Sequence, residues 1–240
     1  MSAGPELLPW DTEFLGFPVA RLRPTALDEA AFDAVLRHCR AVGIRLLYLY
    51  ADPADAVTAA TARRAGLPLA DHRLTFEMLL PATPNYTART GFQIRPTTTY
   101  SSRLEALVWQ SGEYSRFRRD PNFAPDVFPR LYSQWLRNIL AGRTARQLLV
   151  AESADEVVQG LLVLDEKHHQ TSLELLAVAQ ALRGRGLGWQ FLEAAQRQAY
   201  AWGHPALRLV TQADNEPACR LYRRFGFRVT HEEHLYHCWL

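Results

Sequence analysis

The stretch from Leu175 to Ala195 constrains the fold of this chain more than any other. Its first residues are apolar and predict a buried strand, and its last residues have the spacing of an amphipathic helix. Between them lie Gly184, Gly186 and Gly188. Glycines at a strand-to-helix turn let backbone amides approach an anion, and the start of a helix favours negative charge. The stretch predicts a pyrophosphate cradle, although the same glycines can also serve simply as a helix start.

Strand and helix patterns alternate in the N-terminal part of the chain, which favours a layered α/β fold. Predicted strands cover residues 19–24, 45–52 and 74–80, and predicted helices cover residues 27–41 and 54–65. Two prolines and several polar residues in 81–91 predict a linker. We therefore expect a smaller N-terminal α/β domain over residues 1–85 and a second domain over residues 91–240.

The second domain is expected to contain a mixed sheet whose first half is antiparallel. Predicted strands cover residues 91–96, 147–151, 157–164, 172–178, 207–211 and 229–240. Predicted helices begin at Ser101 or Ser102 and cover residues 128–140, 187–202 and 216–225. The residues between 115 and 126, rich in Arg and Pro, are expected to form a loop.

The composition is typical of a soluble globular chain, with 48% hydrophobic and 22% charged residues. A net charge of only +2 argues against binding nucleic acid through bulk phosphate neutralisation. We find no stretch of about 20 apolar residues that would span a membrane. The first basic residue is Arg21 and no apolar leader precedes it, so we expect no secretory signal. Three widely spaced cysteines suit a reducing compartment, and the expected location is the cytoplasm.

Two common classes of nucleotide-binding protein fit the glycines poorly. A P-loop requires a Lys–Ser/Thr pair after its second glycine, and that pair is absent here. A dinucleotide-binding fold requires G-x-G-x-x-G early in a βαβ unit, whereas these glycines come late and are spaced by two. Nucleotide hydrolysis and dinucleotide redox chemistry are therefore disfavoured.

Two segments of the chain resemble the signatures of the GNAT acyltransferases. R-G-R-G-L-G, from Arg183 to Gly188, is similar to the R/Q-x-x-G-x-G/A signature of that family. The segment from Val210 to Phe227 resembles the strand, Asn, helix, Tyr and Gly-Phe arrangement that follows it. The matching residues are Asn215, Ala218, Tyr222, Gly226 and Phe227. The resemblance implies the mixed-sheet GNAT acyl-CoA N-acyltransferase fold.

The resemblance also implies a site for acetyl-CoA, the acyl donor, in a cleft where the fourth and fifth strands of the domain separate. A bulge near Leu176 to Val178 would offer backbone groups to the pantetheine, and the amides of the glycine-rich turn would hold the pyrophosphate. The expected cofactor-binding residues are Leu176, Val178, Arg183, Gly184, Arg185, Gly186, Leu187, Gly188, Asn215 and Ala218. No metal is expected.

Family members transfer the acyl group directly from the thioester to an amine. Tyr222 occupies the position where the family often places the general acid that protonates the departing thiolate, although it could instead pack as an aromatic residue. Glu174 is a candidate general base on the strand that carries Val178, and a chain of water molecules is the stronger alternative. An oxyanion needs a donor, for which the backbone amide near Val178 is suited.

A narrower resemblance covers most of the chain. The segments Leu8–Leu22, Ser115–Phe123 and Leu131–Gly142 are similar to dTDP-fucosamine acetyltransferases, which N-acetylate a dTDP-linked 4-amino-4,6-dideoxy sugar for bacterial surface polysaccharide. The resemblance implies a small-molecule acceptor, a sugar nucleotide, and a possible homodimer. Another amine as acceptor, or a non-catalytic module that senses acyl-CoA, remains open.

Arg116 and Phe117 are the candidate acceptor-binding residues. A guanidinium can contact phosphate in bidentate fashion and an aromatic ring can stack on a base, although the segment could equally be a solvated basic loop. The histidines at 231, 234 and 237 do not predict a metal site. A strand has a period of two, so His234 would point away from the face that His231 and His237 share.

Overall fold

The computed structural model describes residues 4–82 and 92–240. It divides into two compact units, and each is considered by itself. The first contains Met1–Leu74, Arg119–Asn122 and His231–Leu240, and the second contains Thr75–Arg118 and Phe123–Thr230. Most of the expected linker lies outside the described residues, and the division into domains 1–85 and 91–240 stays a prediction.

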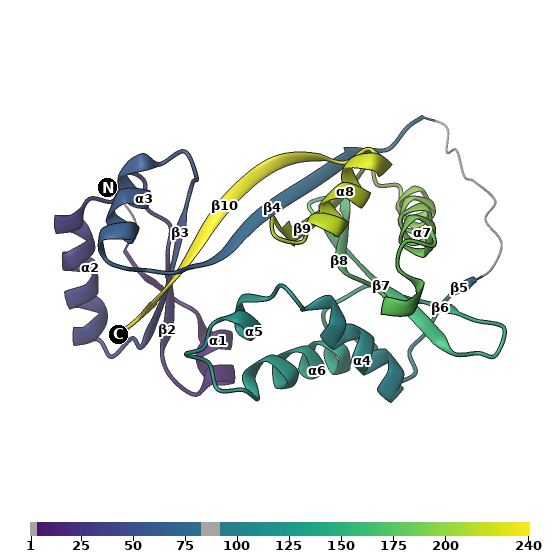
Figure 1. The fold of residues 1–240 in the computed structure, drawn as a ribbon, viewed down its shortest axis with the longest axis horizontal. Helices are drawn as coiled ribbons and strands as arrows, with labels where there is room; N and C mark the ends of the chain where they lie inside the picture. The colour runs from purple at the N-terminus through teal and green to yellow at the C-terminus, as the bar shows by residue number, and fades with distance from the viewer. Residues whose placement is uncertain (1–3, 83–91) are drawn as a thin grey trace. The chain divides into compact units, whose positions relative to one another are not determined.

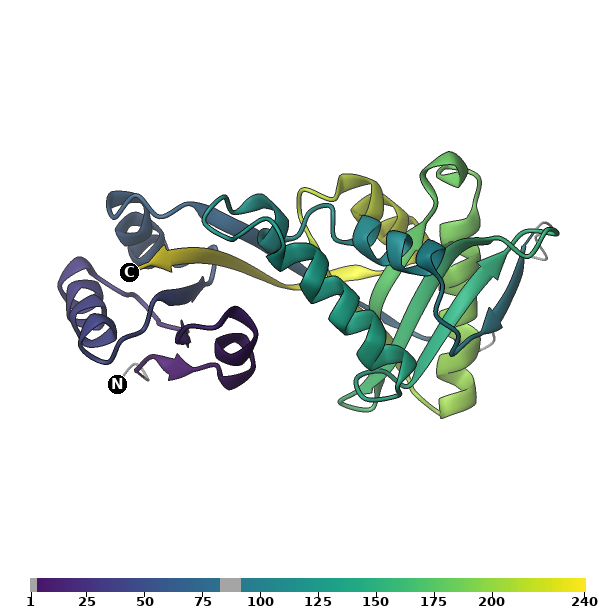
Figure 2. The same ribbon diagram turned by 90° about the horizontal axis from the view of Figure 1, so that it is seen from below.

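The first unit is a mixed sheet with helices on its two sides. Its strands follow the order β1 (Glu6–Leu7), β2 (Val19–Leu22), β3 (Leu46–Ala51) and β10 (Arg228–Trp239). β2 and β3 are parallel, and the other two pairings are antiparallel. Its helices are α1 (Pro9–Leu15), α2 (Glu29–Ala41) and α3 (Ala56–Arg64). Figures 1 and 2 show α1 and α2 on opposite sides of β2.

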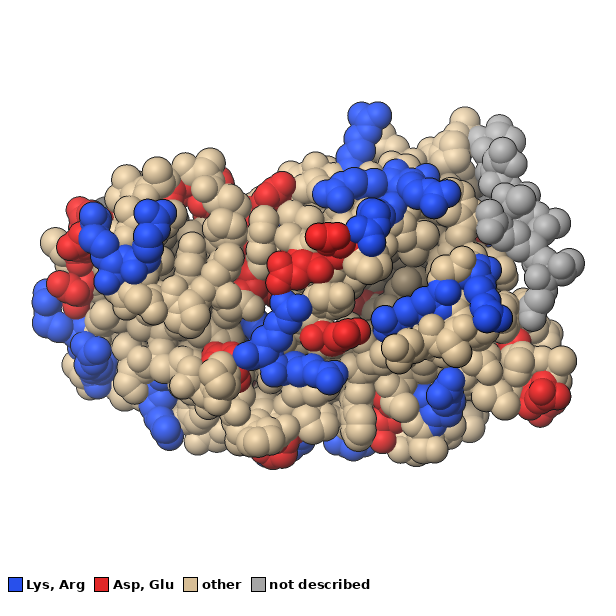
Figure 3. Space-filling view, viewed as in Figure 1, with Lys and Arg blue, Asp and Glu red and all other residues tan. Residues whose placement is uncertain are grey.

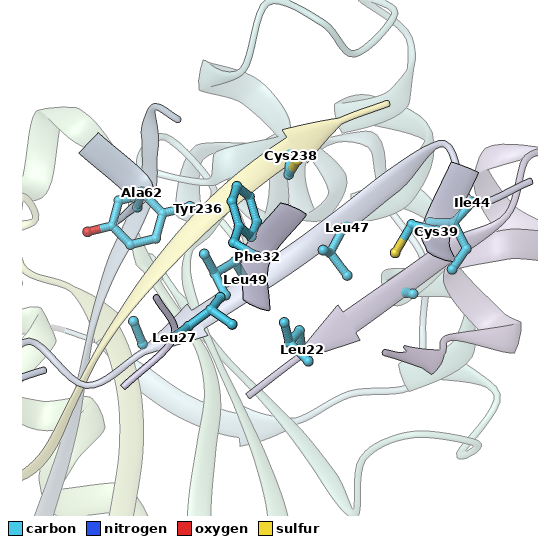
Figure 4. Close-up of a cluster of buried hydrophobic side chains, with 12 residues drawn as sticks. Leu22, Leu27, Phe32, Cys39, Ile44, Leu47, Leu49, Ala62, Tyr236 and Cys238 are labelled. Atoms are coloured by element: carbon cyan, nitrogen blue, oxygen red, sulfur yellow. The ribbon is translucent and has the colours of Figure 1, made fainter. Parts of the chain in front are cut away.

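A hydrophobic cluster joins the sheet of the first unit to α2 and α3 (Figure 4). Leu47 and Leu49 from β3 and Phe32 from α2 meet at its centre, and all three are nearly inaccessible. Both helices begin at an aspartate whose side chain accepts a backbone amide, Asp28 from Ala31 and Asp55 from Thr58. Such caps satisfy amides that the first helical turn leaves without an acceptor.

The second unit is a mixed sheet with α7 on one side and α4 and α6 on the other, as Figure 1 shows. Its strands follow the order β4 (Leu69–Leu79, which belongs to this unit from Thr75 onward), β9 (Ala206–Gln212), β8 (Gln170–Val178), β7 (Val158–Lys167), β6 (Gln147–Glu152) and β5 (Gln93–Pro96). β5 to β8 are antiparallel neighbours, and β8 and β9 are parallel. Its helices are α4 (Ser102–Ser111), α5 (Arg116–Arg119), α6 (Val127–Leu140), α7 (Leu187–Trp202) and α8 (Glu216–Phe225).

Most predicted strands and helices are confirmed to within a few residues. Four elements of the described residues were not predicted, namely β1, α1, α5 and the 3-10 helix η1 (Gln180–Leu182). β1 and α1 precede the first predicted strand, where Pro9 at the first helical position starts α1. The segment 115–126 was expected to be a loop, but it contains the short helix α5. A single helical turn is too short to show apolar periodicity, so the spacing of apolar residues does not reveal it.

Gly160 allows α7 to pack closely against the sheet. It lies opposite Val178 in the β7–β8 pair. A Cβ atom at this position would lie 2.7 Å from Cε2 of Phe191 in α7 and 2.9 Å from the carbonyl oxygen of Ala177. Only a residue without a side chain fits between these two groups.

Replacing Gly160 with Ala should therefore destabilise the protein. We expect the free energy of unfolding to fall by about 1–3 kcal/mol, because the added methyl group displaces an aromatic ring and a strand. Chemical denaturation of the G160A variant measures this change. Gly4→Ala is the matched control, since nothing lies within 4 Å of a Cβ atom there. Equal stability of both variants would contradict the packing argument.

Candidate active site

β8 and β9 separate before either strand ends. Their parallel pairing runs from Thr171 opposite Leu207 to Leu173 opposite Leu209. β8 nevertheless continues to Val178 and β9 to Gln212. The described pairing thus leaves the last part of β8 without β9 beside it, while β7 stays paired with β8 as far as Val178. This is the separation of strands that the family resemblance implies.

A bulge in β8 lies at the point of separation. Val163 of β7 faces Leu175, and the next residue, Leu164, faces Leu173, so Glu174 has no partner across the pair. A bulge adds one residue to a strand and bends it locally. The bulge was expected nearer to Leu176–Val178, and that expectation is wrong by a few residues. The register depends on both strands, so the sequence of one strand does not locate it.

Leu176 and Val178 direct their backbone groups toward the open edge of β8. The amide of Ala179 donates to the carbonyl oxygen of Gln159 on the β7 side, at 2.8 Å. Successive residues of a strand present their amide and carbonyl groups to alternate edges. The backbone groups of Leu176 and Val178 therefore face the side from which β9 has separated, where they can bind an extended ligand.

A glycine-rich turn follows β8 and leads into α7. Gly184 and Gly186 have φ values of +77° and +88°, which side-chain-bearing residues rarely adopt. The first hydrogen bond inside α7 runs from the amide of Gln190 to the carbonyl oxygen of Gly186, at 3.1 Å. The amides of Leu187 and Gly188 therefore have no acceptor within the helix, and the helix dipole adds positive potential there. The turn has the character of an anion site.

Arg183 and Arg185 contribute differently to this turn. The side chain of Arg183 approaches the carbonyl oxygen of Val178 at 3.5 Å and the carboxylate of Glu113 at 3.8 Å, and about half of it is exposed. These contacts hold the turn near the end of β8. Arg185 is exposed, and its amide donates to the carbonyl oxygen of Leu182 at 3.3 Å.

The second sequence motif forms the start of α8. The side-chain oxygen of Asn215 accepts the amide of Ala218 at 3.4 Å, so Asn215 caps this helix. α8 also carries the exposed residues Arg220, Arg223 and Arg224, and Figure 3 shows basic side chains gathered over it. This face of the second unit attracts anions.

The two motifs touch through Gly188. A Cβ atom on Gly188 would lie 2.9 Å from Cδ2 of Leu221 in α8. Gly188 therefore allows α7 and α8 to approach each other, and it also carries an amide that has no acceptor within α7.

Tyr222 lies on the buried side of α8. Its ring centre is 5.7 Å from that of Phe76 and 5.9 Å from that of Phe227, and only 7% of the residue is exposed. Burial, with a smaller contribution from Cys219, raises the pKa of the Tyr222 hydroxyl well above its usual value. The phenol is therefore protonated throughout the physiological range of pH.

Both carboxylate oxygens of Glu174 already accept hydrogen bonds. Oε1 accepts from the hydroxyl of Ser172 at 2.5 Å, and Oε2 lies 2.7 Å from the ammonium group of Lys167. A general base must leave an oxygen accessible to the substrate's proton. The role of Glu174 as a base stays a prediction, and these contacts lend it no support.

Arg116 and Phe117 lie in α5, within a small aromatic group. The Arg116 guanidinium carbon is 4.4 Å from the Phe117 ring centre, and the rings of Phe117 and Phe123 are 5.2 Å apart. Both Arg116 and Phe117 are partly exposed. The arrangement places a guanidinium on an aromatic ring, and its use in binding an acceptor stays a prediction.

Sequence reasoning missed Asp120, which follows α5 directly and belongs to the first unit. Its carboxylate accepts from Nδ1 of His237 at 2.5 Å and from the indole nitrogen of Trp239 at 2.9 Å. Burial alone would raise the pKa of Asp120, but the bonds from His237, the Asn122 amide and Trp239 outweigh it, and the pKa falls far below its usual range. Asp120 thus fastens the residues after α5 to β10.

Within residues 4–82 and 92–240, every helix is too short or too polar to cross a bilayer. No cluster of three or more His, Cys, Asp or Glu side chains there has a geometry suited to a metal ion.

Comparison with known proteins identifies the family. The profile of the Acetyltransferase (GNAT) family matches residues 107–227, which is just over half of the chain. Structures with the same fold include a GCN5-related N-acetyltransferase from Sphaerobacter thermophilus, at a TM-score of 0.64 and 15% identity. The match covers 98% of this chain and 76% of that one. The chain belongs to the GNAT acetyltransferase family, as the two motifs predicted, and has the mixed α/β fold of that family.

More specific similarities come from curated relatives. The dTDP-fucosamine acetyltransferase of Escherichia coli O6:H1 is 34% identical over 127 residues, covering 52% of this chain and 54% of the relative. The spore coat polysaccharide biosynthesis protein SpsD of Bacillus subtilis is 30% identical over 135 residues, covering 55% and 45%. The matched segment thus spans about half the length of each relative.

The Asp120 contacts predict a stability that depends on pH. The pKa of Asp120 is lower in the folded protein than its usual 3.8, so the ionised carboxylate stabilises the fold above that pH and loses this effect in stronger acid. We expect Asp120→Asn to reduce the free energy of unfolding at pH 7 by about 1–3 kcal/mol. The difference from the unmodified protein should shrink below about pH 4.

Urea denaturation between pH 2 and pH 7 measures this difference. Asp126→Asn is the matched control, because Asp126 is an exposed aspartate of the same segment that pairs only weakly with Arg130. A difference between D120N and the unmodified protein that stays constant over this range would show that the charge of Asp120 is unimportant.

Proposed function

We propose that this chain is an acetyl-CoA-dependent N-acetyltransferase acting on the amine of a dTDP-linked 4-amino-4,6-dideoxy sugar. The observation that carries the proposal is the open edge of β8 beside the glycine-rich turn, since together they form the binding surface expected for a pantetheine and its pyrophosphate. The names of the two curated relatives, which concern fucosamine and coat polysaccharide, support a sugar nucleotide as the acceptor.

The residues of the second unit fit acetyl-CoA, which supplies an acetyl group activated as a thioester. The amides of Leu187 and Gly188 would bind the pyrophosphate, because they point along the axis of α7 without an acceptor inside the helix. Gly184 and Gly186 permit the turn through their positive φ values. Leu176 and Val178 would bind the pantetheine through their backbone groups, as in the pairing of a further strand.

Two groups of the chain would assist the transfer. The amide of Val178 would donate a hydrogen bond to the thioester oxygen as negative charge develops on it. The Tyr222 hydroxyl would donate a hydrogen bond to the departing sulfur. The usual pKa of a phenol is already above that of a thiol and burial of Tyr222 raises it further, so complete proton transfer is unfavourable and the phenol acts mainly as a hydrogen-bond donor in the transition state.

The attacking amine must lose its proton before or during the reaction. Glu174 accepts from Ser172 and Lys167, so it would serve as a base only if one of these contacts were released. A chain of water molecules fits the contacts better. We therefore propose that water molecules remove the proton of the amine, with Glu174 as the alternative base.

The acceptor would contact α5, where Arg116 carries a charge suited to phosphate and Phe117 offers a ring. We also infer that the protein works in the cytoplasm, where sugar nucleotides and acetyl-CoA are both available, and that the acceptor is a small molecule.

A different amine is the second candidate acceptor. Mycothiol acetyltransferases are also similar to this chain, with 40% identity over 80 residues for that of Jonesia denitrificans. A streptothricin acetyltransferase is 38% identical over 58 residues. These shorter matches support the acyl-donor site more than any particular acceptor.

Tyr222→Phe tests the chemistry. We expect kcat to fall by about 10²- to 10⁴-fold, because the donor to sulfur is removed, while the affinity for acetyl-CoA stays the same. Release of free thiol measures kcat, and calorimetry measures affinity. Tyr100→Phe is the matched control, since Tyr100 is 53% exposed. Unchanged turnover in Y222F would remove Tyr222 from the mechanism.

An acceptor panel tests the substrate. With acetyl-CoA present, we expect acetylation of dTDP-4-amino-4,6-dideoxy-galactose at a kcat/KM well above that for a free amino sugar, a mycothiol-type amine or streptothricin. Mass spectrometry of the products identifies the acetylated nitrogen. Preference for either of the last two would favour the second candidate. Binding of acetyl-CoA without turnover of any amine would favour an acyl-CoA sensor.

A further inference from the structure

The second unit carries a carboxylate beside the glycine-rich turn that keeps both of its oxygens accessible. Glu113 follows Gly112, the residue that ends α4, and its side chain is 51% exposed. Among the residues that the structure describes, its ion-pair partner is Arg183, whose Nη2 lies 3.8 Å from Oε2. This distance is longer than a hydrogen bond. Glu113 can therefore accept a hydrogen bond from a ligand without giving one up, whereas both oxygens of Glu174 are already occupied.

Arg183 places this carboxylate near the end of β8. Its Nε approaches the carbonyl oxygen of Val178 at 3.5 Å, while its Nη2 faces Glu113. The carboxylate and the Val178 carbonyl thus lie on two sides of one guanidinium. The amide of Val178 is the proposed donor to the thioester oxygen, so Glu113 is one side chain away from the expected position of the acetyl group. Glu174 precedes Val178 by four residues, which is up to about 13 Å along a strand.

Glu113 and Tyr222 belong to opposite sides of the sheet. α4 packs against β7 and β8 on the side opposite α7, as Figure 1 shows. α8, which carries Tyr222, lies on the side of α7, because Gly188 of α7 approaches Leu221 of α8. An amine must reach the thioester carbon while another group serves the departing sulfur. Two groups on opposite sides can do both without obstructing each other.

The backbone that carries Glu113 is held firmly. A Cβ atom on Gly112 would lie 2.4 Å from Cζ of Tyr132 and 2.6 Å from Cε2 of Phe128, so the end of α4 is seated closely on α6. The amide of Ser115 donates to the carbonyl oxygen of Gly112 at 2.9 Å, which closes a turn around Glu113. A carboxylate on such a backbone loses less entropy when it binds a ligand than one on a free loop.

The charges that follow Glu113 in the chain match those of an amino-sugar nucleotide. Arg116 and Arg118 of α5 come three and five residues later, and each guanidinium lies on an aromatic ring, with 5.3 Å between that of Arg118 and the ring of Phe128. A dTDP-linked amino sugar carries an amine at one end and a negatively charged diphosphate nearer the other. The run from Glu113 to Arg118 therefore offers an acceptor group for the amine and positive charge for the phosphates.

We propose that Glu113 binds the amine of the acceptor, accepting a hydrogen bond from its N–H and orienting the nitrogen toward the thioester carbon. The proposal rests on the proposed function, which supplies the acceptor and the position of the thioester. The C–N bond forms as the C–S bond breaks, the proton of the nitrogen passes to water, and the sulfur leaves as a thiolate that accepts from Tyr222. The usual pKa of a carboxyl group lies several units below that of an amine, so a carboxylate orients an amine more readily than it takes its proton.

Steady-state kinetics on the full chain test this role, with acetyl-CoA and dTDP-4-amino-4,6-dideoxy-galactose. In Glu113→Gln we expect KM for the acceptor to rise about 10- to 100-fold, because a charge-assisted hydrogen bond is lost. Affinity for acetyl-CoA, measured by calorimetry, should change by less than about threefold, since an exposed ion pair such as that with Arg183 contributes little. Glu113→Asp keeps the charge and should recover part of the effect. Glu29→Gln is the matched control, because Glu29 is 58% exposed and also pairs with an arginine, Arg64.

A second measurement separates binding of the amine from a structural role. Calorimetry compares the amino sugar nucleotide with the same compound carrying a hydroxyl group at C4. The unmodified protein should prefer the amine, and E113Q should bind both compounds with similar affinity. A structural role for Glu113 would weaken both compounds equally.

The proposal is overturned by an unchanged KM in folded E113Q, by a loss of affinity for acetyl-CoA alone, or by equal weakening of both sugar nucleotides. If E113Q does not fold, the unmodified protein decides, because equal affinity for amine and hydroxyl compounds would reject a carboxylate that binds the amine. Acetylation of a different amine, with a KM that rises in E113Q, would reject the sugar acceptor and leave the role of Glu113 intact. Absence of turnover with every amine would reject both.

Discussion

The candidate site depends on hydrogen bonds that β8 and β9 do not make. Two parallel strands of this length would ordinarily pair to their ends, since unpaired backbone groups are costly when buried. Here the pairing ends at Leu173 and Leu209, and the bulge at Glu174 changes the direction of β8 at that place. The groups left open on Leu176 and Val178 are then available to a ligand with the hydrogen-bonding pattern of an extended chain.

The open edge is useful only if β8 is held firmly on its other side. β7 pairs with β8 up to Val178, and Gly160 of β7 lets Phe191 of α7 rest against that end of the sheet. The turn that carries Gly184 and Gly186 therefore joins two well-anchored elements. A turn fixed at both ends presents its amides in one arrangement, which lowers the entropy lost when an anion binds.

The sequence predicted the fold, the family and the order of elements because the signals for these are local. Apolar periodicity marked most strands and helices, and the glycines marked the turn into α7. The predicted position of the bulge in β8 was wrong because the register depends on both β7 and β8, and the sequence of one strand does not determine it. Asp120 was missed because its partner His237 is 117 residues away in the chain. Glu113 was likewise missed, because its partner Arg183 is distant in the chain and no spacing in the sequence shows this contact.

The contact between Gly188 and Leu221 means that the two motifs cannot diverge independently. An alanine at position 188 would press on Leu221. A relative with a larger residue at position 188 therefore needs either a smaller residue at position 221 or a wider spacing between α7 and α8. Among homologous chains the volumes of these two side chains should vary inversely. The summed volume of these two side chains therefore limits how closely α7, which begins at the coenzyme-binding turn, can approach α8, which carries Tyr222.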